Sequence, residues 1–118
     1  MAPENIFLIA EAENTPIGFA QLVMDSKDES IRGIKTLEVR RIYATQEQIG
    51  KGVGKALMTA SIEEAKQRGC DSIWLGVWEK NPRAIAFYRK WGFQEVGTHI
   101  FVLGDDPQRD FIMELVLS

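Results

Sequence analysis

Three glycines alternate in a short stretch near the middle of the chain, a pattern typical of a loop whose backbone approaches an anion closely. The stretch is Gln48–Lys55, and its glycines are Gly50, Gly52 and Gly54. It follows a strand-like run and precedes a helix-like run, so the first N–H groups of that helix would point at the same anion. The pattern predicts a bound phosphate group. A strand-to-helix turn without any ligand would show the same spacing, and this alternative stays open at this point.

Two familiar phosphate-binding loops do not fit this spacing. A Walker-type loop needs a hydroxyl residue after Gly-Lys, whereas Ala56 follows Lys55, and Ile49 stands where the leading glycine belongs. A dinucleotide-binding Gly-x-Gly-x-x-Gly fingerprint also fails, because Lys55 or Leu57 occupies its last position. A nucleotide would therefore have to be bound in another way.

The elements that position this loop can be predicted from hydrophobic periodicity and from turn residues. Strands are predicted at Ile6–Ala12, Ile17–Met24, Lys35–Ala44, Ser72–Trp78, Gln94–Val102 and Phe111–Leu117, and helices at Val53–Gln67 and between Asn81 and Gly92. The turn Asn14–Pro16 makes the first two strands a hairpin, and a polar connection is expected from Gly104 to Asp110. The order β-β-β-α-β-α-β-β predicts the α+β class with α/β-type layers, a mixed central sheet flanked by helices. Residues 1–118 would form a single domain.

Periodicity also predicts which side chains share a face. In the first helix the apolar side would hold Val53, Ala56, Leu57, Ala60 and Ala65. In the second helix one stripe would hold Ala84, Phe87, Tyr88 and Trp91. Strict alternation in the third strand would place Leu37, Val39, Arg41 and Tyr43 on one face and Glu38, Arg40 and Ile42 on the other.

Composition limits the possible partners. The net charge is −3 and no basic block occurs, so nucleic acid is not an expected partner. No apolar run is long enough to span a membrane, and no metal is expected to bind. The single cysteine, Cys70, cannot form an internal disulfide and is expected to be a buried thiol in a protein of the reducing cytoplasm.

A second motif follows the glycine loop. Asn81, Ala84, Phe87-Tyr88 and Gly92-Phe93 fit the pattern Asn-x-x-Ala-x-x-Phe-Tyr-x-x-x-Gly-Phe at every position. The combination resembles the GNAT superfamily of acyl-CoA-dependent N-acetyltransferases, in which the glycine loop is usually Arg/Gln-x-x-Gly-x-Gly/Ala. The resemblance covers the chain from Leu37 to Phe93. The chain departs from the pattern at Ile49, which occupies the Arg/Gln position, and the family's fold and cosubstrate, acetyl-CoA, are the expectations that follow.

The resemblance implies a set of CoA-binding groups in a sheet that splays open beside the loop. The backbone of Ile42, Tyr43 and Ala44 would pair with the pantetheine arm like an added strand. The backbone N–H groups that would meet the pyrophosphate belong to Gly50, Lys51, Gly52, Val53, Gly54 and Lys55. Asn81 would contact the pantetheine from the opposite side, or serve only as a helix cap. Lys90 would reach a CoA phosphate, or remain a solvated lysine.

The resemblance also implies catalytic roles. Transfer from a thioester to an amine expels a thiolate, and Tyr88 is the predicted acid, since a phenol can protonate a thiolate at neutral pH. By position alone Tyr88 could equally be a core aromatic. Glu38 is the predicted base that takes the proton of the amine, and the alternative is an ion-paired strand residue. His99, the one histidine, is expected to be structural.

Three segments look like the PaiA-type bacterial branch of the family, which acetylates spermine and spermidine. They are Leu37–Tyr43, Ile73–Asn81 and Gly97–Met113. The expected reaction is therefore acetyl transfer to a primary amine of a polyamine or another small molecule. The alternatives are transfer to a protein or peptide amine, and a CoA-binding module without turnover. Family members usually carry another strand and two helices before the first hairpin. A truncation, a natural short form and completion by a partner chain are the alternatives that would explain their lack here, and the surface left open would favour a homodimer.

Overall fold

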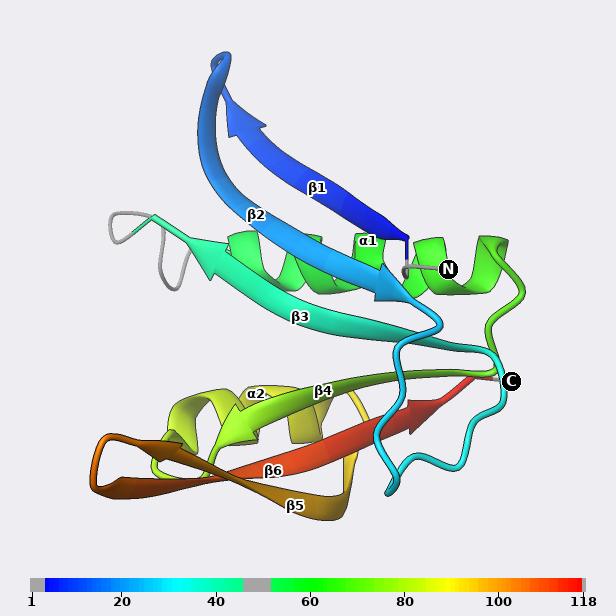
Figure 1. Ribbon diagram of the computed structural model, residues 1–118. Coiled ribbons are helices and arrows are strands. Elements are labelled where there is room, and N and C mark those ends of the chain that lie inside the picture. Colours follow the sequence, from blue (N-terminus) through cyan, green and yellow to red (C-terminus); the bar gives the residue numbers. More distant parts are fainter. Residues whose placement is uncertain (1–3, 46–51, 118) are drawn as a thin grey trace.

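A computed structural model describes residues 4–45 and 52–117, without the side chains of Phe101 and Leu103. Its elements are β1 (Asn5–Ala12), β2 (Thr15–Met24), β3 (Thr36–Ala44), α1 (Val53–Gln67), β4 (Ser72–Trp78), α2 (Pro82–Lys90), β5 (Gln94–Leu103) and β6 (Asp106–Val116). The six strands form one mixed sheet in the order β1-β2-β3-β4-β6-β5. Both helices lie behind this sheet in Figure 1, and the face away from them is called here the open face. The predicted class and element order are confirmed.

The sheet consists of two halves that are joined at one end only. β3 and β4 are parallel and pair over Thr36–Glu38 and Ser72–Trp74, and no further pairs join them in the described ranges. Beyond that point β3 continues along β2, and β4 continues along β6. The two strands therefore diverge into a V-shaped gap, with α1 behind the upper half and α2 behind the lower half (Figure 1).

The helix stripes differ in part from those predicted. The residues of α1 that are buried are Val53, Leu57, Met58, Ser61 and Ala65, whereas Ala56 and Ala60 are exposed. Because α1 packs on β1, β2 and β3 at once, its buried stripe includes the large Met58 side chain and leaves out Ala56 and Ala60. In α2 the predicted stripe is only half-buried, and Ile85 is the buried residue.

The faces predicted for the end of β3 are wrong, because β3 contains a β-bulge. Gln21 pairs with Arg41 and Leu22 pairs with Val39, so Arg40 is an extra residue between two registered pairs. An extra residue shifts the alternation by one position. Ile42 therefore packs against the hydrophobic core on the helix side instead of sharing a face with Glu38.

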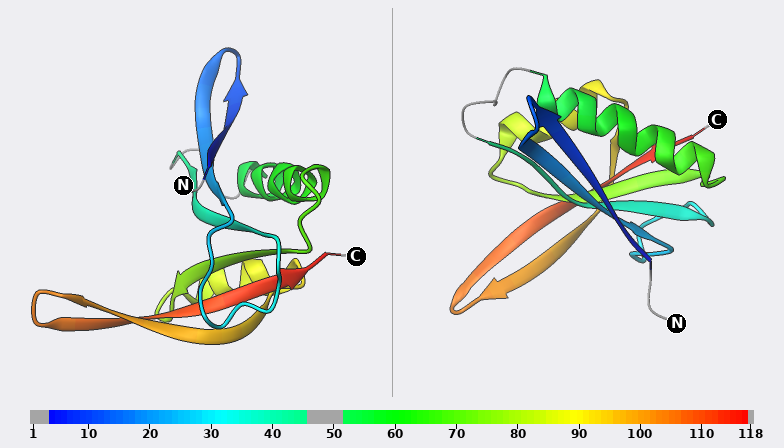
Figure 2. Two further views of the ribbon diagram at one scale, coloured as in Figure 1. Left: turned by 45° about the vertical axis from the view of Figure 1, so that its right-hand side comes forward. Right: turned by 90° about the horizontal axis from the view of Figure 1, so that it is seen from above.

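Both hairpins turn more tightly than predicted. Glu13 and Asn14, each with positive φ, form a two-residue turn between β1 and β2. The polar connection predicted over Gly104–Asp110 is wrong, because β6 already begins at Asp106 and pairs with Leu103. This hairpin projects beyond the rest of the sheet (Figure 2), where neither face needs an apolar side chain, so hydrophobic alternation could not reveal it.

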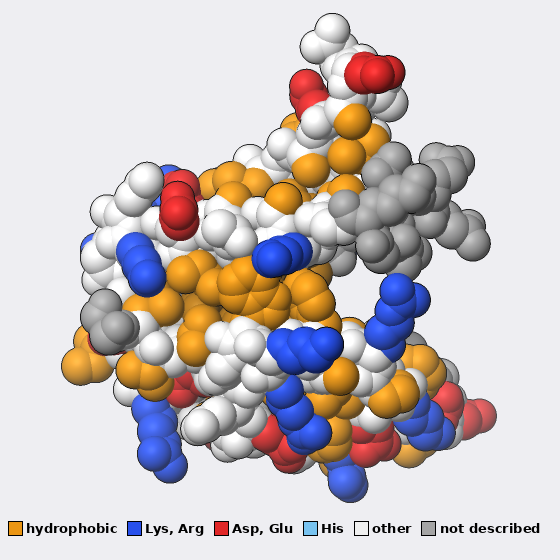
Figure 3. All heavy atoms as spheres, turned by 180° about the vertical axis from the view of Figure 1, so that it is seen from behind, with side chains coloured by type: hydrophobic (Ala, Val, Ile, Leu, Met, Phe, Trp, Pro, Cys, Tyr) orange, Lys and Arg blue, Asp and Glu red, His pale blue; other side chains and the backbone are white. Residues whose placement is uncertain are grey.

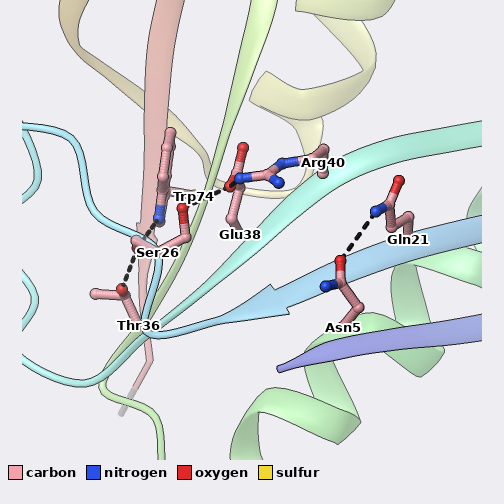
Figure 4. A network of polar contacts seen from close by, with 7 residues as sticks. All are labelled: Asn5, Gln21, Ser26, Thr36, Glu38, Arg40 and Trp74. Atoms are coloured by element: carbon pink, nitrogen blue, oxygen red, sulfur yellow. Dashed lines mark hydrogen bonds and ion pairs between the residues drawn. The ribbon is translucent and has the colours of Figure 1, made fainter. Parts of the chain in front are cut away.

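The segment of residues 25–35, called here the crossing segment, runs over the open face in front of β4 and β6 (Figure 1). Its start is held at Ser26, whose hydroxyl donates to Glu38 Oε1 at 2.7 Å and whose carbonyl accepts from Trp74 Nε1 at 2.9 Å (Figure 4). Its far end is held by Glu114, whose carboxylate accepts the backbone N–H groups of Arg32 and Gly33 at 3.1 and 3.0 Å. These contacts fix a loop that has few apolar side chains of its own.

Replacing Glu114 with alanine should therefore destabilise the protein. Glu114 is 4% exposed, and its loss removes two charge-assisted hydrogen bonds to the crossing segment. We expect the free energy of unfolding to fall by about 2–3 kcal/mol, as measured by urea denaturation. The amide protons of Arg32 and Gly33 should also lose protection from hydrogen exchange. The exposed Glu63→Ala on α1 is the matched control, and equal stability of the two variants would contradict this account.

Candidate active site

A cavity of about 430 Å³ lies in the gap between the diverging strands. It is lined by Ile42, Tyr43, Ala44, Gly52, Gly54, Lys55, Asn81, Arg83, Ala84, Phe87 and Tyr88. Seen from the helix side, the molecule is hollowed between its two halves, with hydrophobic side chains inside and lysine and arginine side chains around the rim (Figure 3). Such a surface suits a ligand with an apolar arm and an anionic end.

One wall of the cavity is the outer edge of β3. Ile42, Tyr43 and Ala44 pair with β2 on one side, and in the described residues no strand pairs with them on the other. Main-chain donors and acceptors along this edge are therefore available to an extended ligand, as in strand addition. The bulge at Arg40 turns Ile42 toward the helices, which makes this wall apolar on its inner side.

The second wall is the start of α1. Gly52 is its N-cap, with φ 88°, and no side chain caps the helix. The N–H groups of Val53, Gly54 and Lys55 have no acceptor within the helix, so they are free to bind an anion. Val53 takes part only through its backbone, because its side chain lies in the core at 6% exposure.

The third wall is the start of α2. Asn81 caps this helix through Oδ1, which accepts from Ala84 N at 3.2 Å, and the Pro82 ring occupies the first helical position. Arg83, which the sequence reasoning missed, also lines the cavity. The first turns of α1 and α2 contain no acidic residue, and each carries a basic one, Lys55 and Arg83. Basic residues in the first turn of a helix oppose its dipole. Their presence at both helix starts was the feature of the sequence that could have indicated an anion between the two helices.

Tyr88 also lines the cavity. Its ring contacts Phe87 at 5.5 Å and Phe93 at 5.9 Å between centroids, both edge-to-face. Burial raises the pKa of the Tyr88 phenol above its ordinary value. The hydroxyl thus stays protonated at neutral pH and can donate a proton to a group inside the cavity.

Some of the residues predicted from sequence do not line the cavity. Glu38 lies on the open face, where Oε1 accepts from Ser26 and from Arg40 at 2.8 Å (Figure 4). Lys90 is exposed in the last turn of α2, away from Asn81. Gly50 and Lys51 lie outside the described residues. The roles predicted for these residues stay predictions.

Other side chains that could do chemistry lie elsewhere. Cys70 is buried, and the loss of solvent raises the pKa of its thiol. His99 Nδ1 lies 3.7 Å from Asp28 Oδ2 of the crossing segment. Among the described residues, no cluster of His, Cys, Asp or Glu has the arrangement of a metal site, and no helix is long and apolar enough to cross a membrane.

The two roles of Asn81 can be separated by replacing it with aspartate. Aspartate caps a helix as well as asparagine does, but it has no N–H to donate and adds a negative charge to the cavity. We expect Asn81→Asp to keep the thermal stability of the free protein and to weaken CoA binding by about tenfold or more, as measured by calorimetric titration. Asn81→Ala should instead lower stability as well. Unchanged CoA affinity in both variants would show that Asn81 is only a cap.

The comparisons with known proteins agree with this geometry. The chain belongs to the Acetyltransferase (GNAT) family, whose model matches residues 1–93. It is 32% identical over 115 residues to an uncharacterized N-acetyltransferase of Lactobacillus delbrueckii subsp. lactis, covering 98% of this chain and 66% of that protein.

Solved structures show the same fold. A ribosomal-protein-alanine N-acetyltransferase from Brucella melitensis matches with a TM-score of 0.78 and 27% identity, over 96% of this chain and 69% of that one. A PaiA N-acetyltransferase from Thermoplasma acidophilum, in complex with coenzyme A, matches with a TM-score of 0.74 and 29% identity, over 97% and 62%. The chain thus spans about two thirds of the length of the proteins that it matches.

Proposed function

We propose that this chain transfers an acetyl group from acetyl-CoA directly to a primary amine. The observation that carries the proposal is the cavity itself, which is lined by a free strand edge, by two helix starts that bear basic residues and by Tyr88. Membership of the Acetyltransferase (GNAT) family supports it. The three walls and Tyr88 together suit the three chemical parts of an acyl-CoA, which are an amide-rich arm, a pyrophosphate and a thioester.

Each wall has a proposed role in binding acetyl-CoA. The edge Ile42–Ala44 pairs with the amides of the pantetheine arm. The N–H groups of Gly52–Lys55 bind the pyrophosphate, and the cationic side chains of Lys55 and Arg83 add charge-assisted contacts. Asn81 donates its free amide N–H to the arm from the α2 side.

Tyr88 is the proposed acid of the transfer. The amine nitrogen forms a bond to the carbonyl carbon of the thioester, and the bond from that carbon to sulfur breaks. The sulfur leaves as a thiolate and takes the proton of the Tyr88 hydroxyl, and the amine nitrogen gives up one proton to a base. A phenol inside an apolar pocket is suited to this step, because it keeps its proton at neutral pH until the thiolate forms next to it.

The acceptor that we propose is a polyamine such as spermidine or spermine. The likeness to the PaiA N-acetyltransferase supports this choice. The net charge of −3 would also attract a polycation. A peptide amine is the second candidate, favoured by the likeness to the ribosomal-protein-alanine N-acetyltransferase.

A thiol-release assay with acetyl-CoA and a panel of amines tests the proposal. The panel holds spermidine, spermine and a peptide with an N-terminal alanine, and mass spectrometry identifies the acetylated product. We expect release of CoA with spermidine or spermine at rates well above that without amine. If CoA raises the melting temperature but no amine is acetylated, the chain is a CoA-binding module and the proposed function is wrong.

A further inference from the structure

A second ionisable group lies beside the gap on the open face. In β4, Leu75 and Val77 face the core, so Gly76 between them faces the other way. A Cβ on Gly76 would lie 3.7 Å from Asp110 Oδ2 of β6, which places this carboxylate on the open face beside β4. Gly76 lies past Trp74, where β4 has lost its pairing with β3, so the Asp110 carboxylate lies beside a part of β4 whose other edge borders the gap.

Asp110 and Tyr88 thus stand on opposite sides of the sheet. Tyr88 packs with the core on the helix side, whereas Asp110 faces the open side. No side chain at Gly76 fills the space in front of the Asp110 carboxylate. A thioester held in the gap would have an acid on the helix side and a carboxylate on the open face.

On the basis of the proposed function, we propose that Asp110 takes the proton from the attacking amine. As nitrogen bonds to the carbonyl carbon, its proton passes to a carboxylate oxygen of Asp110. The carbon–sulfur bond breaks, and the leaving sulfur takes the proton of Tyr88. Asp110 then gives its proton to water, and Tyr88 recovers one from water, so the enzyme returns to its starting state.

The surroundings of Asp110 favour this role over the same role for Glu38. Glu38 already accepts hydrogen bonds from Ser26 and from the permanently charged Arg40 at one oxygen, which commits it to holding the crossing segment. Asp110 is half-buried, and burial raises the pKa of its carboxyl group. A carboxylate that is less well solvated is a stronger proton acceptor.

The charged group that faces Asp110 from β5 is His99, its partner in the register. Its positive form acts in the opposite direction and lowers the pKa of Asp110. Asp28 of the crossing segment lies 3.7 Å from His99, so the positive form of His99 acts on the Asp28 carboxylate as well as on Asp110. From β4 the register partner is the neutral Trp78. Desolvation is the larger of the two effects on Asp110, so the carboxylate keeps its raised basicity.

The test compares Asp110→Asn with Asp106→Asn, an exposed residue of the same strand at the far end of the hairpin. The acceptor is whichever of spermidine, spermine and the alanine-terminated peptide the natural sequence acetylates fastest. We expect Asp110→Asn to lower kcat/KM by about 100-fold or more, with unchanged CoA affinity, and Asp106→Asn to lower it by no more than about threefold.

A second variant separates proton transfer from a structural effect. In Asp110→Ala, added sodium formate should restore part of the lost rate by serving as a carboxylate base, and it should not accelerate the natural sequence. Activity of Asp110→Asn within about threefold of the natural sequence, or a loss in Asp110→Ala that formate does not reverse, would overturn the inference. If the natural sequence acetylates none of the three amines, the proposed function itself fails, and the inference fails with it.

Discussion

Replacing Tyr88 with phenylalanine should lower kcat by about 100-fold or more, while the dissociation constant of CoA changes by no more than about twofold. The substitution removes only the hydroxyl. The ring remains and keeps its edge-to-face contacts with Phe87 and Phe93, so the cavity wall is unchanged. The proton that the leaving thiolate takes from Tyr88 is then missing, and the defect should appear in the chemical step alone.

The pH dependence follows from the direction of the pKa shift. Tyr88 is active as an acid when protonated, and burial raises its pKa above the ordinary value of about 10. The acid is therefore fully protonated at neutral pH and up to about pH 9, and kcat should not fall through loss of its proton over that range.

The control for Tyr88→Phe is Phe87→Leu, which alters a ring beside Tyr88 without touching the hydroxyl. An unchanged kcat in Tyr88→Phe would remove Tyr88 from the role of acid.

Reversing the charges of Lys55 and Arg83 together should weaken CoA binding by about 100-fold or more. Both side chains line the cavity, and they lie in the first turns of α1 and α2, where unpaired N–H groups already favour an anion. A hydrogen bond to a charged group contributes about 1.5–3 kcal/mol, so losing two of them is enough for this effect. Calorimetric titration of Lys55→Glu/Arg83→Glu with CoA measures it.

The control for this double variant is Lys66→Glu, which reverses a charge in the last turn of α1, far from the cavity. The CoA affinity of Lys66→Glu should fall only through the change in net charge, and it should approach that of the natural sequence as the salt concentration is raised. If the double variant and Lys66→Glu lose affinity equally, the contacts of Lys55 and Arg83 are not specific. The phosphate, if bound at the helix starts, would then be held by the backbone N–H groups alone.

Most of the fold could be predicted from sequence because short signals mark where its elements end. The bounds of α1 and β4 agree residue for residue with the prediction, since Gly69 ends α1 and the apolar run Ser72–Trp78 has clear limits. Asn81 and Pro82 mark the start of α2, and Gly92, with φ 99°, ends it. These signals lie within a few residues of the ends of the elements, so they do not depend on contacts with distant parts of the chain.

The features that could not be predicted depend on partners distant in the sequence. The bulge at Arg40 exists only in the pairing of β3 with β2, and it changes which side of β3 Ile42 occupies. The early start of β6 depends on pairing with β5, because its polar residues carry no alternation. Glu114 holds Arg32 and Gly33 across most of the chain, and nothing in their local sequence indicates this contact.

The candidate site likewise combines residues that can be predicted from local sequence patterns with residues that only the folded sheet brings together. The cavity brings together Ile42–Ala44, Gly52, Gly54, Lys55, Asn81 and Tyr88, which the family resemblance had indicated. Arg83 was missed because it lies between motif positions. The role that we propose for Asp110 as the base could not be predicted, because its place beside Gly76 depends on the register of β4 with β6. A motif identifies residues that contact a common ligand, whereas the side chains around them are fixed only by the folded sheet.

The central claim is that the gap between β3 and β4 holds the acyl donor, and nuclear magnetic resonance of the 15N-labelled chain tests it most directly. On addition of CoA, the amide signals of Ile42, Tyr43, Ala44 and Gly54 should shift together with one dissociation constant. Those of Ile6 and Leu8 on β1, which pack against the core away from the cavity, should stay in place. Shifts that leave Ile42–Ala44 unaffected, or that gather elsewhere on the sheet, would contradict the account.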